Sequence, residues 1–463
     1  MRLLTRRKYR LGTSIVILAA GEGKRMNSTL PKVLQPLAGR PLLQHVIDCA
    51  QAVGADDICI VYGHGGEHVR AAFESAEVRW TLQAEQHGTG HAVQQAMPGT
   101  PDENQVIVLF GDVPLLLPET VSGLSEVCGA EGVGVLTVEM DDPFGYGRII
   151  REQGAVVRIV EQKDASEEEQ AVAEVNTGVM CCPAARLKTW LGRLKNDNSQ
   201  GEYYLTDVLA MAVSDGLNVH GVKAASQVEV MGINDKKQLA AAERAYQARL
   251  VDELMAQGVG FADPARVDIR GELHCGRDVY IDVNAVFEGK VILGDGVHIE
   301  SNNLIRDTEI GAGTVVHSNC HIESSSTGRD CEIGPFARMR PGTELADRVK
   351  LGNFVEVKKS KIADGSKVNH LTYIGDTVMG SGVNVGAGTI TCNYDGANKH
   401  QTTIGDGVFI GSGVQLVAPV EIGRDATIGA GSTITKNAPD GQLTLERGKQ
   451  TSIEGWKKPV KKA

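Results

Sequence analysis

The sequence lacks several features that would assign it to a common class of protein. Its 463 residues contain no apolar run of about 18 residues, so no membrane span is expected. Aromatic residues make up only 4%, whereas glycine occurs 55 times, which indicates many tight turns and slender cores. The formal net charge of −11 argues against a general nucleic-acid-binding protein, because such proteins need a basic surface.

Cysteine is scarce and poorly placed for metal or disulfide chemistry. The nine cysteines are scattered, their number is odd, and no Cys-x-x-Cys pair occurs. Such thiols are typical of a reducing compartment, so we expect a cytoplasmic protein without a structural zinc site. The apolar stretch in "MRLLTRRKYRLGTSIVILAA" is too short for a secretion signal, and we interpret this segment as a basic arm before the first strand.

The stretch "ILAAGEGKRM" (residues 17–26) joins an apolar run to a glycine loop, but it lacks the residues that define both common phosphate loops. A dinucleotide fingerprint would have Gly or Ala where Met26 stands, and the Gly-Lys-Ser/Thr of a P-loop is missing. Gly21 and Gly23 still free backbone N–H groups for a di- or triphosphate. The cations available to it are Lys24, Arg25 and Lys32. A surface turn with solvated cations is the alternative.

Strand-like runs alternate with helical patterns in the first half of the chain. The expected strands are "SIVILAA", "DICIVYG", "VIVLFGD" and "VGVLTVE", and helices are expected at 41–53 and 90–97. This predicts a Rossmann-like α/β domain with a mostly parallel sheet over residues 1–236. Ligands bind beyond the carboxyl ends of such strands, where the glycine loop and "FGDVPLL" lie. Asp112 in that second motif can hold Mg²⁺ against phosphate oxygens.

A different pattern follows at residues 237–257, where Ala, Leu, Glu and Lys dominate. Asp235 can cap a helix there, and Gly258 ends it. The apolar residues expected on one face of this helix are Leu239, Tyr246, Leu250 and Leu254. We interpret the segment as a linker helix between two domains.

From about residue 260 to 436 an aliphatic residue recurs every six positions. The clearest series is Ile404, Ile410, Leu416, Ile422, Ile428 and Ile434. This period fits neither an α-helix nor an amphipathic strand, but it is typical of a parallel β-helix, in which three hexads form a coil of about 18 residues. The aliphatic residues should point inward. "KKSK" (358–361) and "CNYDGANKHQTT" (392–403) interrupt the period and are predicted loops, where function tends to concentrate.

Further motifs complete a family pattern. "LAAGEGKRM…LPKVLQPLAGRP", "QAEQHGTGHA", "GDVPL", "PFGYGRI", "EVNTG" and "GEYYLTD" occur in the order found in sugar-phosphate nucleotidyltransferases. With the hexapeptide half, nearly the whole chain resembles the bacterial bifunctional N-acetylglucosamine-1-phosphate uridyltransferase / glucosamine-1-phosphate N-acetyltransferase family. The resemblance implies a left-handed β-helix over 258–463 and a homotrimer.

The resemblance also implies two reactions. Acetyl-CoA would acetylate glucosamine-1-phosphate, and UTP would then transfer its uridylyl group to N-acetylglucosamine-1-phosphate with release of pyrophosphate. The product, UDP-N-acetylglucosamine, would feed peptidoglycan and lipopolysaccharide synthesis. These partners are small molecules, and neither nucleic acid nor membrane insertion is expected.

For the first domain, the matched motifs assign roles residue by residue. Arg25 and Lys32 would be catalytic and neutralise the triphosphate, and Asp112 and Asn234 would hold Mg²⁺. The residues that would contact the nucleotide are Leu18, Ala19, Ala20, Gly21, Phe110 and Gly111, with Gln83, Gly88 and Thr89 reading uracil. The residues that would hold the amino sugar are Gly147, Glu161 and Asn176.

For the second domain, His370 in "KVNHLTYIGD" is the candidate base. A lone histidine is more often a packed or solvated side chain, but acetyl transfer to an amine needs a base of near-neutral pKa. Glu356 in the nearby sequence offers a further hydrogen bond. The resemblance assigns the sugar phosphate to Arg340, Lys358, Tyr373 and Asn384. It assigns acetyl-CoA to Ala387, Ser412, Ala430 and Arg447, while Asn393 and Tyr394 would contact either substrate.

One alternative is a monofunctional sugar nucleotidyltransferase whose β-helix serves only as an oligomerisation or regulatory scaffold. The presence of a histidine and a group of cations among the hexads favours two activities.

Overall fold

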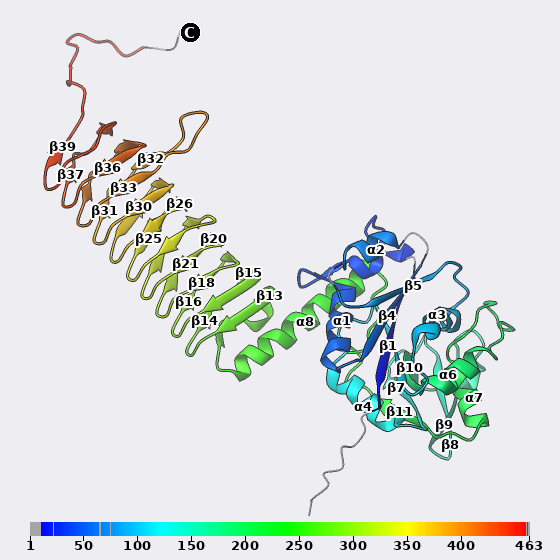
Figure 1. The fold of residues 1–463 in the computed structure, drawn as a ribbon. Helices are drawn as coiled ribbons and strands as arrows, with labels where there is room; N and C mark the ends of the chain where they lie inside the picture. Colours follow the sequence, from blue (N-terminus) through cyan, green and yellow to red (C-terminus); the bar gives the residue numbers. More distant parts are fainter. Residues whose placement is uncertain (1–10, 22, 64–65, 75, 460, 462–463) are drawn as a thin grey trace, which may run out of the picture. The chain divides into compact units, whose positions relative to one another are not determined.

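The computed structural model describes residues 11–21, 23–63, 66–74, 76–459 and 461. The expected basic arm, residues 1–10, lies outside this set. The chain divides into two compact units, Met1–Tyr246 and Gln247–Ala463, which we call the α/β unit and the β-helix unit and describe separately (Figure 1). No helix in the described residues has the length and apolar character needed to cross a membrane.

A mostly parallel sheet forms the centre of the α/β unit, in the order β11-β7-β10-β6-β1-β4-β5, and the β8–β9 hairpin is attached to β10 (Figure 1). The strands are β1 (Thr13–Ala19), β4 (Asp57–Gly63), β5 (Arg79–Gln83), β6 (Gln105–Phe110), β7 (Val133–Glu139), β8 (Arg148–Glu152), β9 (Ala155–Val160), β10 (Glu174–Pro183) and β11 (Val219–Lys223), with a small hairpin of β2 (Pro36–Leu37) and β3 (Arg40–Pro41). The predicted α/β architecture is confirmed. Within the seven-strand order, strand β10 is the exception to parallel pairing, because it runs antiparallel to both β6 and β7.

Helices cover both faces of this sheet. They are α1 (Leu42–Ala52), α2 (Glu67–Ala71), α3 (Thr89–Ala96), α4 (Pro118–Cys128), α5 (Glu167–Gln170), α6 (Ala184–Leu191) and α7 (Asp207–Ser214), with short 3₁₀ turns η1 (Lys24–Met26), η2 (Lys32–Leu34) and η3 (Met97–Gly99). Successive side chains of β1 point to opposite faces of the sheet. Ile15 and Ile17 pack in the core with α1 and α4, while Val16 packs in the core with α3, α6 and α7. This explains why the buried strand is a continuous apolar run.

The predicted linker helix is present as α8 (Lys236–Ala256). The Asp235 carboxylate accepts hydrogen bonds from the backbone N–H groups of Lys237 and Gln238, both at 2.9 Å, as a cap should. Ala242 in its first half is buried in the α/β unit, whereas Val251 in its second half is buried in the β-helix unit.

The β-helix unit is a stack of short parallel strands (Figure 1). One sheet consists of β12 (Gly260–Phe261), β14 (Tyr280–Ile281), β16 (His298–Ile299), β19 (Val315–Val316), β22 (Glu332–Ile333), β25 (Lys350–Asn353), β28 (Lys367–His370), β31 (Asn384–Val385), β34 (Phe409–Ile410), β37 (Thr427–Ile428) and β39 (Leu443–Thr444). A short turn η4 (Pro264–Arg266) connects β12 to the other sheet.

The second sheet winds over the remaining sides of the coils. It consists of β13 (Val267–Cys275), β15 (Ala285–Leu293), β17 (Leu304–Arg306), β18 (Glu309–Ile310), β20 (His321–Glu323), β21 (Ser326–Thr327), β23 (Arg338–Met339), β24 (Glu344–Leu345), β26 (Glu356–Lys358), β27 (Lys361–Ile362), β29 (Tyr373–Gly375), β30 (Thr377–Met379), β32 (Ile390–Cys392), β33 (Thr402–Ile404), β35 (Gln415–Val417), β36 (Val420–Ile422) and β38 (Thr433–Ile434).

The hexad prediction is confirmed for the core. The six aliphatic residues from Ile404 to Ile434 are all buried, with at most 3% of each exposed. They stack on equivalent residues of neighbouring coils, so one continuous apolar column fills the helix. The left-handed winding remains an expectation from the resemblance.

Two details of the coil prediction need correction. Tyr280 pairs with His298, a step of 18 residues, but His298 pairs with Val315, a step of only 17. Some coils are therefore one residue shorter than others, and "KKSK" is a corner of such a coil and not an inserted loop. Lys358 ends β26, Lys359 turns the chain at φ +46°, and the next strand starts at once. Removing one residue from a corner shifts the sequence period but leaves the stack intact.

The second predicted loop is a true insertion. Ile390 pairs with Gln415, a step of 25 residues, and the extra chain lies between β32 and β33. Figure 1 shows it projecting from the coils beside β32. Tyr394 and Lys399 form an antiparallel bridge across it, so the loop is a small hairpin.

Candidate active sites

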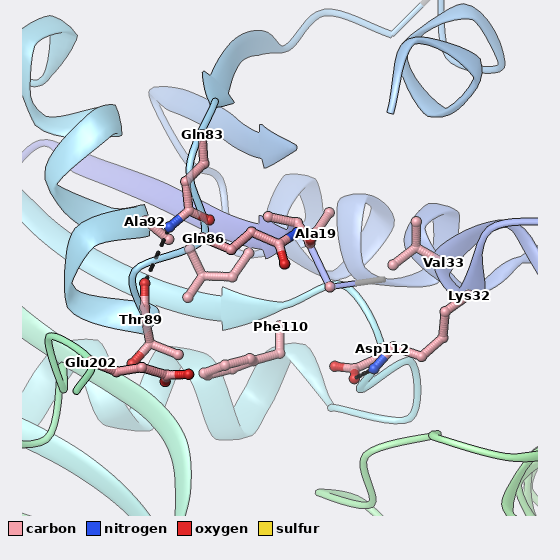
Figure 2. Close-up of a pocket in the computed structure, with 14 residues that line it drawn as sticks. Ala19, Lys32, Val33, Gln83, Gln86, Thr89, Ala92, Phe110, Asp112 and Glu202 are labelled. Atoms are coloured by element: carbon pink, nitrogen blue, oxygen red, sulfur yellow. Dashed lines mark hydrogen bonds and ion pairs between the residues drawn. The ribbon is translucent and has the colours of Figure 1, made fainter. Parts of the chain in front are cut away.

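A cavity of about 320 Å³ lies at the carboxyl ends of β1 and β6 in the α/β unit (Figure 2). The predicted nucleotide residues in its lining are Leu18, Ala19, Ala20, Gly21, Lys32, Gln83, Gly88, Thr89, Phe110 and Asp112. Sequence reasoning missed Val33, Gln86, Ala92 and Glu202, which also line it. Gln86 and Glu202 belong to motifs quoted above, and their polar side chains could have marked them as candidate ligand contacts.

Three predicted residues meet at one end of this cavity. The Lys32 ammonium makes an ion pair with Asp112, drawn in Figure 2, and donates to Asn234 Oδ1 at 3.2 Å. Asn234 reaches this point because the neighbouring Ile233 N–H donates to the Asp112 carbonyl at 2.9 Å. Gly23, at φ +63°, leaves room for Lys32, since a Cβ there would lie 2.6 Å from the Lys32 Cβ.

This arrangement fits a divalent cation. The Asp112 carboxylate oxygen and the Asn234 amide oxygen both face the Lys32 ammonium. Hard oxygen ligands of this kind are the ones that Mg²⁺ prefers, together with substrate phosphates. Lys32 and Asp112 are mostly buried, with side chains 12% and 18% exposed, so their charges are weakly screened.

The residues predicted to read the base lie at the opposite end. The Gln83 amide nitrogen donates to the Gly88 carbonyl at 3.2 Å, and the Gln86 amide nitrogen donates to the Ala20 carbonyl at 2.5 Å. The second contact ties the loop after β5 to the end of β1. Thr89 Oγ1 accepts from the Leu205 N–H at 3.2 Å.

The predicted sugar residues form a neighbouring cluster. The Asn176 N–H donates to the Gly147 carbonyl at 2.8 Å, and a Cβ at Gly147 would lie 3.4 Å from the Glu161 carboxylate. Gly178, two residues after Asn176, packs against Phe110 of the cavity lining. Its φ is +87°, and a Cβ there would lie 2.5 Å from the Phe110 ring. The structure therefore brings Gly147, Glu161 and Asn176 together.

Glu161 is the carboxylate of this cluster, and its pKa is raised. Burial raises its pKa, and the carboxylates of Asp164, Asp207 and Glu202 raise it further, while a hydrogen bond from Thr206 Oγ1 at 3.1 Å opposes the rise. A carboxylate held in this environment gains from accepting a ligand hydroxyl group.

Like Asn234 and the sugar cluster, the predicted residues Arg25 and Gly111 lie outside the cavity lining. Arg25 is exposed on η1, and its catalytic role stays a prediction. Gly111 lies behind the lining, where its N–H donates to the Leu18 carbonyl at 2.9 Å and a Cβ would contact Leu43 and Val33.

In the β-helix unit, His370 ends β28 and lines a second cavity, of about 620 Å³. His370 Nδ1 lies 2.9 Å from Asn353 Oδ1, one coil away. An amide oxygen only accepts, so Nδ1 carries the proton and Nε2 keeps its lone pair. Such a tautomer can accept a proton from an amine. Phe336 and Phe354 stack beside it, with ring centroids 5.2 Å apart.

Cations and polar groups gather on the adjacent side of the coils. Arg340 donates to Glu356 Oε1 at 2.9 Å, and Lys358 Nζ lies 3.9 Å from Asp376 Oδ2. Asn393 Nδ2 also donates to Asp376, at 2.5 Å. The structure thus brings Lys358 and Asn393 to Asp376, which sequence reasoning missed.

Lys399 is the other missed member of this cluster. Its side chain lies close enough to Lys358 to lower the pKa of that ammonium, and burial and Arg340 lower it further. The carboxylate of Asp376 opposes this shift. Crowded cations of this kind favour a bound phosphate, which supplies the missing negative charge. Tyr373 contributes through its hydroxyl, 3.5 Å from Asn393 Nδ2.

The predicted acetyl-CoA residues form a column. The Gly413 N–H donates to the Ala387 carbonyl at 2.7 Å, and the Gly431 N–H donates to the Ser412 carbonyl at 2.8 Å, so Ala387, Ser412 and Ala430 stand on successive coils. The Arg447 guanidinium lies against Gly429, the residue before Ala430 of this column. A Cβ at Gly429 would lie 2.7 Å from it.

The remaining predicted residues lie nearby. Asn384 starts β31 and pairs in register with Lys367, three residues before His370. Tyr394 is exposed on the hairpin loop, where its hydroxyl donates to the Gly396 carbonyl at 2.6 Å.

Comparisons with known proteins match both units. Residues 15–200 match the family of MobA-like NTP transferase domains, and residues 401–436 match the bacterial transferase hexapeptide (six repeats). A relative named "Bifunctional protein GlmU" from Aromatoleum aromaticum is 60% identical over 449 residues, which cover 97% of this chain and 99% of the relative. Those of the same name from Azoarcus sp. and Ralstonia nicotianae are 58% and 56% identical over similar lengths, with 96% and 97% of this chain and 99% of each relative covered.

Identity of this extent spans both units without a gap of domain size. The chain therefore belongs to the GlmU family, the bifunctional uridyltransferases and acetyltransferases that make UDP-N-acetylglucosamine.

Proposed function

We propose that each unit catalyses one of two consecutive steps, with acetyl transfer in the β-helix unit and uridylyl transfer in the α/β unit. The observation that carries this proposal is that each unit has its own site of matching chemistry. In the β-helix unit, His370 lines a cavity with Nε2 able to accept a proton. In the α/β unit, the oxygens of Asp112 and Asn234 meet at the Lys32 ammonium beside the other cavity.

In the first step, the glucosamine amine attacks the thioester carbonyl carbon of acetyl-CoA. His370 Nε2 takes the proton that the amine loses, and the carbon–sulfur bond breaks. That proton then passes from His370 to the coenzyme A thiolate, which leaves as the thiol. Arg340, Lys358 and Lys399 bind the sugar phosphate and hold the amine in place. Asn353 fixes the ring tautomer that makes Nε2 the basic nitrogen.

In the second step, a phosphate oxygen of N-acetylglucosamine-1-phosphate attacks the α-phosphorus of UTP, and pyrophosphate leaves. Lys32 and Arg25 neutralise charge that develops on the phosphate oxygens. Asp112 and Asn234 are the residues that would hold Mg²⁺, which supplies Lewis-acid stabilisation of those oxygens when bound. Glu161 and Asn176 orient the sugar, and Gln83 contacts the base.

We further propose a cytoplasmic homotrimer in which a neighbouring subunit completes the acetyl-transfer site. The exposed stacked pair Phe336 and Phe354 beside His370 supports this, because exposed apolar surface next to a site is typical of an interface. Light scattering should give three times the chain mass of 49.3 kDa. We retain 1–236, 237–257 and 258–463 as the proposed domain limits.

The experiment that tests the function supplies glucosamine-1-phosphate, acetyl-CoA, UTP and Mg²⁺ together and measures UDP-N-acetylglucosamine. Omission of acetyl-CoA should nearly abolish product, and preformed N-acetylglucosamine-1-phosphate should restore it. Product formation only from the preformed acetylated sugar would instead support a β-helix that acts as a scaffold.

A further inference from the structure

The side-chain amide of Gln83 is held by two contacts on its nitrogen. Gln83 is 3% exposed, and its Nε2 lies 3.2 Å from the Gly88 carbonyl oxygen and 3.1 Å from His91 Nδ1. Figure 2 shows the amide nitrogen directed at the backbone oxygen beside Thr89 and the amide oxygen turned away from it. His91 stands in the motif "QAEQHGTGHA", but the family pattern assigned it no role.

These contacts determine the orientation of the amide. A backbone carbonyl can only accept a hydrogen bond, so the Gln83 atom that faces Gly88 must be the nitrogen. The second amide hydrogen then points at His91 Nδ1, which must be the unprotonated ring nitrogen. The His91 proton then lies on Nε2, which is 3.1 Å from Gln95 Nε2. Because an N–H group needs an acceptor, this tautomer requires the Gln95 amide to be turned over so that its oxygen faces His91.

With both amide hydrogens engaged, Gln83 can offer a ligand only its oxygen. Among the described residues no hydrogen bond is made to Gln83 Oε1, and Gln83 lines the nucleotide cavity. Uracil presents a donor at N3, whereas cytosine presents an acceptor there. An amide restricted to accepting therefore favours uracil and opposes cytosine, because cytosine would leave two acceptors facing each other.

We infer that His91 is a specificity-determining positioning residue, which makes Gln83 an obligate acceptor and so selects UTP over CTP. This inference rests on the proposed contact between Gln83 and the base. Without His91, the second amide hydrogen is free, and the amide can tilt to donate to cytosine.

The experiment measures kcat/KM for UTP and for CTP in variants at position 91. His91→Phe keeps a planar ring between the neighbouring His87 and Tyr203 rings but removes the acceptor. We expect the preference for UTP over CTP to fall about tenfold, mainly through a higher KM for UTP, since a lost neutral hydrogen bond is worth about one factor of ten. His91→Asn places an amide oxygen near the Nδ1 position and should restore most of the preference.

Two controls separate the possible failures. Thermal unfolding of the same preparations reports whether the α/β unit is folded, and His91→Leu serves if His91→Phe is unstable. Gln83→Ala should lose the base preference. If it keeps that preference, the proposed Gln83 contact is wrong. If Gln83→Ala loses it while His91→Phe and His91→Leu keep it, the role of His91 is overturned.

Discussion

His370 Nδ1 and Asn353 Oδ1 lie 2.9 Å apart on neighbouring coils of the β-helix. This hydrogen bond directs the lone pair of Nε2 away from Asn353. His370→Ala should lower kcat for acetyl transfer at least about 100-fold, because general bases contribute factors of this size. Uridylyl transfer in the same preparation should change less than about twofold, since the other unit contains that site.

His317 provides a matched control for this prediction. It is a half-buried histidine of the same β-helix, hydrogen-bonded to Glu300 at 2.9 Å and outside the cavity that His370 lines. His317→Ala should leave acetyl transfer nearly unchanged. Equal losses in both variants would contradict the assignment of His370 as the base.

Lys32 joins Asp112 and Asn234 through a single ammonium group. Lys32→Met should lower kcat for UDP-N-acetylglucosamine formation about 100-fold, because it removes charge from the developing oxyanions. The same variant should bind Mn²⁺ more tightly without nucleotide, since the ammonium no longer competes for the two oxygens. Paramagnetic titration measures that affinity, and weaker Mn²⁺ binding by the variant would count against this reading.

Arg25 is exposed and lies outside the cavity lining, so its proposed role depends on the bound triphosphate. Arg25→Ala should lower kcat for uridylyl transfer about 100-fold while protein stability stays the same. Lys24→Ala, at the adjacent position on η1, is the control and should have a much smaller effect. Steady-state kinetics with varied UTP measures both variants, and unchanged turnover in Arg25→Ala would refute the role.

Burial raises the pKa of Glu161 in the folded protein, so folding is favoured when this carboxyl is protonated. That contribution is complete below the ordinary glutamate pKa and is lost as the pH rises through the raised folded pKa. Glu161→Gln, which cannot ionise, should therefore raise the Tm at pH 7 by about 2 °C, and the gain should vanish near pH 4. Its KM for N-acetylglucosamine-1-phosphate should rise, since the amide is a weaker hydroxyl acceptor.

The pKa of Glu169 is shifted in the opposite direction, so its effect on stability has the opposite pH dependence. Its pKa is lowered by the Ser166 backbone N–H and by Arg158, so its carboxylate stabilises the fold above the ordinary pKa. Glu169→Gln should lower the Tm at neutral pH, and the loss should disappear as the pH falls. Scanning calorimetry across pH 4 to 8 compares the two variants, and matching shifts of the same sign would contradict the argument.

Local signals explain what could be predicted. The six-residue period depends only on which residues face inward in each strand, and Ile410 and Ile428 are buried as that period requires. Cavity-lining residues at strand ends could be predicted because parallel strands end at one edge of a sheet, as at Leu18 and Phe110. The glycine loop alone indicated a phosphate but not the nucleotide.

Long-range contacts explain what could not be predicted. The hydrogen bond between Lys32 and Asn234 joins residues 202 positions apart, and Glu202 enters the nucleotide cavity from the loop before α7. Asn393 reaches Asp376, and Lys399 approaches Lys358, because an inserted hairpin folds back on the coil. Such contacts depend on the path of the whole chain, which no local pattern encodes.

The sequence by itself determined the two architectures, the apolar column of the β-helix and the motifs that place the chain in its family, because these follow from local spacing and residue type. Only the tertiary structure decided that Asn353 sets the His370 tautomer and that His91 leaves Gln83 with one free acceptor. Hydrogen-bond direction depends on where donors and acceptors meet in space, and that is fixed only when the chain is folded.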